Sequence, residues 1–179
     1  MKKKILAIVT SIILIGAITP ASAATPKGEK GYRYWGYFQA APDNNSWTYA
    51  QTGPAATKLK DGAVEGWRFS FSSKTVDTGT PLDKPNFKSI CGAEKAMSNE
   101  IRVALVIDFG LKEIAPLGEK VQPLIRKCVK IPASGNGLDA LKMAVKVRTS
   151  ASGMICGINN FPAKECSAEV ATPKSLAKK

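Results

Sequence analysis

The chain has 179 residues, with 26 Lys and Arg against 14 Asp and Glu and no histidine, which gives a net charge of +12. Because histidine is absent, Ser-His-Asp and Cys-His catalysis are excluded and no imidazole is available to a metal. The length fits one domain of ordinary size with a real core.

The N-terminus has the three-part layout of a secretory signal peptide. Three lysines at 2–4 precede an apolar run at 5–18, and Ala21-Ser22-Ala23 follows Pro20. The run is shorter than the roughly 20 residues that a membrane-spanning helix needs. We therefore predict cleavage after Ala23 and a secreted, extracellular protein.

Cleavage would leave residues 24–179, with a net charge of about +9 because three lysines are lost. This charge favours an anionic cell-envelope polymer or acidic ligand, although an ordinary solvated surface is the alternative. We expect no nucleic acid partner, because an exported protein rarely meets one. The predicted organisation is a signal peptide (1–23), a flexible leader (24–31), a single globular domain (32–167) and a disordered basic tail (168–179).

Ten of the thirteen aromatic residues fall between Tyr32 and Phe71. The stretch predicts strands at about 32–39, 46–51 and 64–71, separated by turns. The first of these strands carries aromatic side chains on both faces, and two faces are hard to bury in a small sheet. Most of the aromatic residues are expected in the core, and some on a ligand platform. The platform candidates are Tyr34, Trp35, Tyr37, Trp47 and Tyr49.

The remaining helices and strands are predicted from the spacing of apolar residues and from the positions of proline and glycine. The run at 101–109 predicts a central strand that is buried on both faces. The pattern at 138–145 predicts a helix after a glycine-containing entry. Further elements are expected as a short helix near 87–91, strands at 128–131, 145–148 and 154–158, and loops at 72–88 and 111–118.

All four cysteines lie in the predicted exported part, and an even number there indicates disulfides. Three pairings are possible. We favour Cys91–Cys128 with Cys156–Cys166, because the second pair is ten residues apart around a turn-rich loop. A metal site is the alternative, and it would need reduced thiolates without help from histidine.

Other chemistry is weakly indicated. A two-carboxylate hydrolase could use Glu65, Asp108 and Glu113, but nothing in their spacing requires it. The loop at 135–137 before the predicted helix could hold an anion, and the turn at 43–45 could hold calcium, although plain turns explain both. The Asp-Phe-Gly triplet at 108–110 lacks every other kinase motif. We therefore expect no enzyme, no metal and no cofactor.

Several blocks resemble a family of actinobacterial secreted proteins of uncharacterised function. These blocks are YRYWGYFQ, SWTYAQTGPA, DGAVEGWRFSF, SICG, VALVIDFG and CGINNFPAKEC, and they span about residues 32–167. The resemblance implies an association with energy-coupling-factor transporter components. Many relatives carry a C-terminal membrane anchor, which this sequence does not show.

A second resemblance is to the transcobalamin C-terminal-like domain, a β-rich module that helps to cover a corrinoid. The segments at 59–62 and 64–68 resemble its second half, and those at 138–141 and 153–159 resemble its first half. The halves occur here in the opposite order, as in a circular permutation. The resemblance implies a permuted, β-grasp-like fold and a corrinoid such as cobalamin as ligand.

The sequence thus predicts an α+β domain with a small, mostly antiparallel sheet, one or two helices and two disulfides. The expected function is non-enzymatic capture of a micronutrient for an uptake system, with membrane transporter components as partners. A corrinoid is the concrete candidate for the micronutrient. The five platform aromatics would stack on a flat ligand, and Arg33 or Arg68 would meet its anionic groups. The alternative is an adhesion or cell-envelope protein that binds polysaccharide or a protein partner.

Overall fold

The computed structural model describes residues 28–43 and 45–177 of the chain. The predicted signal peptide lies outside the described residues. Among the described residues, no helix is both long enough and apolar enough to cross a membrane. In chain order the elements are β1 (Lys30–Ala40), β2 (Trp47–Tyr49), β3 (Ala63–Ser72), α1 (Phe87–Cys91), β4 (Glu100–Asp108), η1 (Lys112–Ile114), β5 (Ile125–Pro132), α2 (Gly137–Ala144), β6 (Val147–Thr149), β7 (Ile155–Ile158) and β8 (Ala168–Ala171).

The main sheet has six strands in the order β2-β1-β3-β4-β5, with β8 also paired to β1. All of its pairs are antiparallel except β3 with β4, which are parallel and joined by a crossover that contains α1. A separate hairpin is formed by β6 and β7. The predicted α+β class, with a small and mostly antiparallel sheet and two helices, is confirmed.

Alternation along the strands gives the sheet two different faces. One face, which we call the aromatic face, carries the odd-numbered side chains of β1, β3, β4 and β5, including Trp35, Trp67 and Leu105. The other, the α1 face, carries the even-numbered side chains, including Val64 and Ala104. Strand β4 is buried on both faces, as its continuous apolar run predicts.

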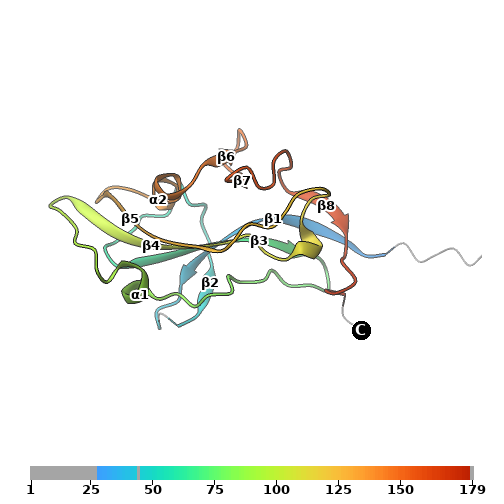
Figure 1. Ribbon diagram of the computed structural model, residues 1–179, viewed down its shortest axis with the longest axis horizontal. Helices are drawn as coiled ribbons and strands as arrows, with labels where there is room; N and C mark the ends of the chain where they lie inside the picture. The colour runs from blue at the N-terminus through green and yellow to red at the C-terminus, as the bar shows by residue number, and fades with distance from the viewer. Residues whose placement is uncertain (1–27, 44, 178–179) are drawn as a thin grey trace, which may run out of the picture.

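The two helices cover opposite faces of the sheet (Figure 1). Helix α1 begins after Asn86, whose side chain accepts from the backbone N–H of Ser89. Helix α2 begins with a reciprocal capping box between Asn136 and Asp139, which satisfies two backbone donors at once. Such caps matter here because helices of five and eight residues have little intrinsic stability.

One disulfide secures each side of the sheet. Cys91–Cys128 joins α1 to β5, and Cys156–Cys166 joins β7 to the segment before β8. The favoured pairing of the three possible ones is therefore confirmed. Phe161, within the loop closed by the second disulfide, packs edge-on against Phe69.

The ends of the domain differ from the prediction. The segment 168–171 was expected in a disordered tail, but it forms β8 and pairs with the start of β1. Residues 30–31 were expected in a flexible leader and instead belong to β1. Four residues of alternating Ala, Glu and Val give too weak a strand signal to be recognised, because their pairing depends on an edge of β1 that the sequence does not display.

Candidate functional site

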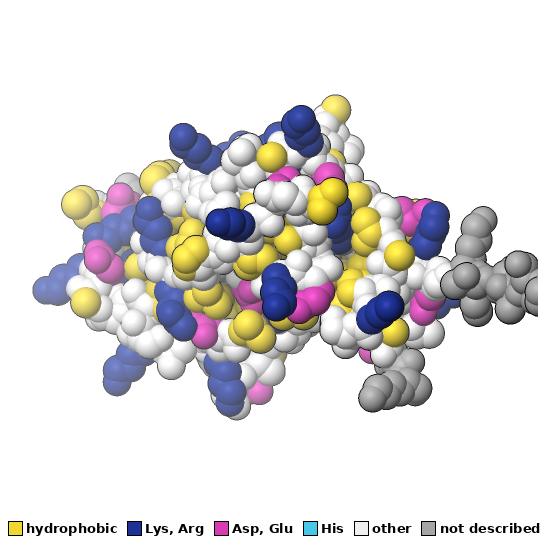
Figure 2. Space-filling model, turned by 45° about the vertical axis from the view of Figure 1, so that its right-hand side comes forward, with side chains coloured by type: hydrophobic (Ala, Val, Ile, Leu, Met, Phe, Trp, Pro, Cys, Tyr) yellow, Lys and Arg dark blue, Asp and Glu magenta, His cyan; other side chains and the backbone are white. Residues whose placement is uncertain are grey.

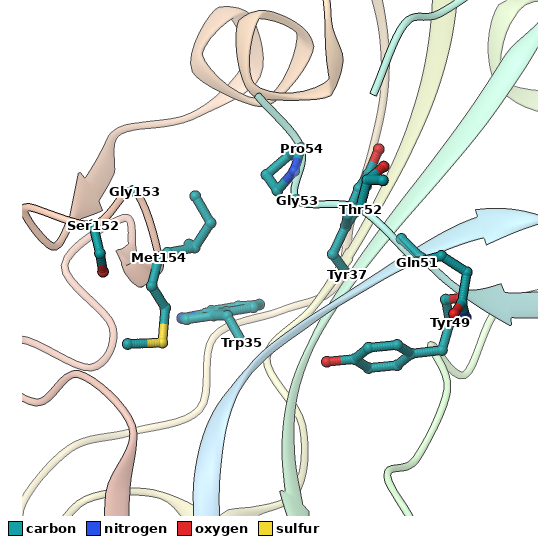
Figure 3. Close-up of a pocket in the computed structure, with 12 residues that line it drawn as sticks. Trp35, Tyr37, Tyr49, Gln51, Thr52, Gly53, Pro54, Ser152, Gly153 and Met154 are labelled. Carbon is teal, nitrogen blue, oxygen red and sulfur yellow. The ribbon is translucent and has the colours of Figure 1, made fainter. Parts of the chain in front are cut away.

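A pocket of about 340 Å³ opens on the aromatic face beside β1. In Figure 3 the Trp35 indole lies between Met154 on one side and Thr52 on the other, with Pro54 above it. Three segments form the walls of this pocket: β1, the segment after β2 and the turn before β7. The lining residues are Trp35, Tyr37, Tyr49, Ala50, Gln51, Thr52, Gly53, Pro54, Ser152, Gly153, Met154 and Ile155.

Trp35 is held firmly at the base of this pocket. Its indole Nε1–H donates to the carbonyl oxygen of Phe161 at 2.9 Å. Its ring meets Phe69 and Phe109 edge-on, with centroids 5.7 Å and 5.3 Å away. Only 6% of the residue is exposed. A rigid aromatic ring with one side toward a cavity can bind a ligand at little entropic cost.

Tyr37 joins the pocket to a buried carboxyl group. Its ring stacks on Trp67 with centroids 5.0 Å apart, and its hydroxyl donates to Glu65. The amide of Gln39 donates to the other Glu65 oxygen at 3.2 Å. Burial raises the pKa of Glu65 to about 7, because no basic group compensates its charge, and burial with the nearby Glu65 raises the pKa of Tyr37.

Three of the seven predicted ligand contacts border this pocket, namely Trp35, Tyr37 and Tyr49. Only Trp35 and Tyr37 belong to the aromatic face, because Tyr49 pairs with Phe38 and its ring packs edge-on against that residue on the α1 face. Tyr34 instead lies on the α1 face, where its hydroxyl is 2.6 Å from that of Thr78. Trp47 also lies on the α1 face, with its indole against Gly66. The predicted aromatic platform is therefore divided between two faces.

The two predicted arginines are engaged elsewhere. Arg33 pairs with Glu165 and also donates to the carbonyl oxygens of Ile114 and Ala115. Arg68 lies 3.4 Å from Asp108, and both side chains are buried on the α1 face. Neither arginine lines the pocket, and no basic side chain is among the described residues that line it beside Trp35.

Met154, Pro54 and Ser152 were not predicted as pocket residues. They lie on two loops that are about 100 residues apart in sequence, and only the fold brings them to Trp35. The one available signal is the turn at Gly153, where φ is +84° and glycine is favoured. That signal predicts a turn without saying what the turn covers.

The candidate hydrolase carboxylates do not come together. Glu65 belongs to the aromatic face, whereas Asp108 pairs with Arg68 on the α1 face. Glu113 is exposed in η1. A two-carboxylate mechanism needs both groups on either side of one substrate bond, and this arrangement does not provide that.

The candidate anion loop has no free backbone donors at the start of α2. The N–H of Gly137 donates to Thr57, that of Leu138 donates to Pro54, and that of Asp139 is capped by Asn136. These bonds use the groups that would bind an anion.

The metal candidates are equally occupied. In the candidate calcium turn, the carboxylate of Asp43 accepts from Asn45 and Ser46, and residue 44 lies outside the described part. The described residues contain no group of three or more acidic, Cys or His side chains that could hold a metal.

The comparisons with known proteins give one match. No curated protein and no solved structure matches this chain. The model of the SCO2322-like domain family matches residues 27–171, which is most of the chain and includes every strand and helix described above. The chain belongs to the SCO2322-like domain family.

Proposed function

We propose that this chain is a secreted, non-enzymatic ligand-binding protein, and that the pocket over Trp35 is its ligand site. The observation that carries the proposal is a cavity of about 340 Å³ with a rigid indole at its base. That volume falls within the range of about 300–1,000 Å³ typical of small-molecule sites. The two disulfides support secretion, since such bonds persist mainly in oxidising compartments.

The lining favours an uncharged ring as the bound group. None of the twelve lining residues is acidic or basic, so a charged group would lose hydration without gaining a partner. The apolar face of a sugar ring can lie against Trp35, while its hydroxyls reach the backbone near Gly53 and the side chain of Ser152. We therefore place a sugar unit of a cell-envelope glycan first among the ligands.

The charge distribution agrees with this choice. In Figure 2 the lysine and arginine side chains are scattered over the visible face, with acidic ones between them. Six ion pairs among the described residues join a basic to an acidic side chain. Attraction to an anionic polymer would then be diffuse and would not select the ligand.

Corrinoid capture is the second ligand hypothesis, and it comes from the resemblance to the transcobalamin C-terminal-like domain. A corrin macrocycle is wider than a sugar ring, so it would rest on the rim and contact Met154 before Trp35. Its uptake would involve the transporter components that the other resemblance implies. The same titration can compare both ligand classes.

The test is isothermal titration of the oxidised protein with N,N′-diacetylchitobiose, cellobiose and cobinamide. Trp35→Ala is a poor variant, because it removes a buried ring and one of the two hydrogen bonds to the carbonyl of Phe161. Met154→Ala is better, since Met154 is 45% exposed at the rim, and Met97→Ala at a 72% exposed position is its matched control.

We expect heat from a disaccharide, with an affinity about tenfold weaker in Met154→Ala and unchanged in Met97→Ala. Heat from cobinamide alone, lost in Met154→Ala, would assign the same pocket to a corrinoid. No heat from any of the three at about 0.1 mM protein would overturn ligand binding at Trp35.

A further inference from the structure

We propose that Glu65 is a positioning residue that controls the Trp35 pocket through Tyr37, so that ligand binding is coupled to proton release from Glu65. The inference rests on the proposed function for its ligand. The coupling between Glu65 and Tyr37 can be tested without one.

The carboxyl group of Glu65 is buried without a cation. Only 1% of the residue is exposed, and it belongs to none of the six ion pairs among the described residues. Its two hydrogen-bond donors, Tyr37 and Gln39, are neutral. A buried carboxylate with neutral donors alone is costly, and groups of this kind occur often at functional sites.

Glu65 also borders open space outside the Trp35 pocket. It lines a second hollow of about 170 Å³, together with Gln39, Lys58 and Lys60. This hollow lies where β1 and β3 separate, just beyond their last pair, Gln39 with Glu65. Open space therefore borders Glu65 on the side away from Trp35, and we infer that a proton reaches the carboxyl group from there without entering the pocket.

Tyr37 is the physical link, because it lies in both places. Its ring lines the Trp35 pocket, and its hydroxyl is bonded to Glu65. Helix α2 leaves the hydroxyl little room, since a Cβ placed on Gly137 would come within 2.6 Å of it. A change in the hydrogen bonding of Glu65 must therefore act on Tyr37 and on the segment around Pro54, which contacts the start of α2.

The titratable groups around Glu65 are few. From β1 there is Tyr37, and from the segment 57–60 there are Lys58 and Lys60, both exposed. The facing residue of β4 is Leu105, which does not titrate. Helix α2 carries Asp139 and Lys142, both exposed, and Asp139 is bound to the backbone of Asn136.

Burial raises the pKa of Glu65 to about 7, and none of these neighbours counteracts that effect with a buried positive charge. Glu65 therefore changes charge near neutral pH. Because Glu65 is hydrogen-bonded to Tyr37, which lines the pocket, this change of charge can be transmitted to the pocket.

The direction of the coupling follows from the donors. Ionised Glu65 requires the hydroxyl proton of Tyr37, which fixes the ring beside the pocket. Once Glu65 is protonated, the Tyr37 hydroxyl can turn to the nearby hydroxyl of Thr57 instead, and the pocket wall loses order. Ligand affinity should then be higher above pH 7 and lower at acidic pH, and binding should release a proton.

The ligand-free test is tryptophan fluorescence from pH 5 to 8.5, because Trp67 stacks on Tyr37 and reports its environment. Wild type should show a transition near pH 7. Glu65→Gln, which keeps a hydrogen-bond acceptor but cannot titrate, should lack it. An identical transition in the two proteins, both shown to be folded by circular dichroism, would overturn the coupling whatever the ligand is.

The ligand test repeats the N,N′-diacetylchitobiose titration at pH 5.5 and 8.5 in buffers of different ionisation enthalpy. Wild type should bind about fivefold more tightly at pH 8.5 and release protons near pH 7, whereas Glu65→Gln and Tyr37→Phe should bind equally at both pH values. Binding in wild type that does not vary with pH would overturn the inference and leave the pocket as a ligand site. Absence of all binding would overturn the proposed function, and the fluorescence titration would still decide the coupling.

Discussion

The two faces of the main sheet each bury a carboxyl group, and they stabilise it in opposite ways. On the α1 face, Asp108 lies 3.4 Å from Arg68 and accepts from the N–H groups of Leu82 and Gly110 at 2.9 Å and 2.8 Å. On the aromatic face, Glu65 has neither a cation nor a backbone donor within the described part of the chain, only Tyr37 and Gln39.

The difference shows that burial alone does not determine what a carboxyl group does. Asp108 has a partner for its charge and connects the loop at 80–82 to the end of β4, so its role is structural. Glu65 has no such partner, so its charge state follows pH. The same sheet therefore contains one buried carboxyl group that is paired with a cation and one that is not.

The largest expected effect is on the paired carboxylate. Asp108→Asn leaves the buried Arg68 without its countercharge, and we expect a loss of about 3–5 kcal/mol in the free energy of unfolding at pH 7. Urea unfolding measures it. Asp83→Asn is the matched control, because its partner Arg126 is 57% exposed and the loss should stay under about 1 kcal/mol. Equal losses in the two variants would remove the structural role given to Asp108.

The disulfides extend the comparison, because one lies on each side. Cys91 and Cys128 are 37 residues apart and Cys156 and Cys166 are 10 apart. Loop-closure entropy then gives about 4 kcal/mol for the first and about 3 kcal/mol for the second. Urea unfolding of Cys91→Ala/Cys128→Ala and Cys156→Ala/Cys166→Ala should show that order. The reverse order would mean that the aromatic face depends more on its disulfide.

The buried carboxyl group of Glu65 predicts that the free energy of unfolding depends on pH. The pKa of Glu65 rises from its ordinary value of 4.5 to about 7 in the folded protein, so between these values the folded state binds more protons than the unfolded state. The free energy of unfolding should therefore fall by up to about 3 kcal/mol as pH rises from 4.5 to 7. Urea midpoints at pH 4, 6 and 8 measure the fall.

Glu65→Gln supplies the control for that fall. The variant should match wild type near pH 4 and be more stable at pH 8. Asp61 does not interfere, because its pKa is lowered to about 2 by Arg102, and its contribution is lost only as pH falls below about 4. The same decline in Glu65→Gln would assign the pH dependence to another group.

The smallest expected effects on stability distinguish Trp35 at the base of the pocket from Met154 at its rim. Trp35→Phe removes one of the two donors to the carbonyl of Phe161, which still accepts from the N–H of Ile158, so we expect a loss of about 0.5–1.5 kcal/mol. Met154→Ala, at a half-exposed position, should change stability by less than about 0.5 kcal/mol. Thermal unfolding of both variants checks this. A large loss in Met154→Ala would show that the rim supports the fold, and its use as a binding probe would then fail.

Much of the fold could be predicted from local patterns. Strands β1, β3 and β4 were recognised from their aromatic and apolar content, and α1 was placed at 87–91 as observed. The parallel pairing of β3 with β4 could not be read in this way, because alternation within a strand says nothing about the direction of its neighbour.

The candidate site was harder to predict for the same reason. Tyr34 and Trp35 are adjacent in sequence, and adjacent residues of a strand point to opposite faces. The register of β2, with Trp47 beside Ala40, places Trp47 on the face away from Trp35. Grouping these aromatics by closeness in sequence was misleading, whereas their parity and pairing decide which of them share a face.

The pairing of β8 with β1 also determines how the domain responds to force. Lys30 at the start of β1 lies beside Ala171 at the end of β8, so these two residues lie at the same end of the ladder. Tension between these two points would load the hydrogen bonds one after another instead of together. The last strand would separate from β1 at low force, and the disulfide between Cys156 and Cys166 would keep the loop between them closed, so that the force would next act on β7.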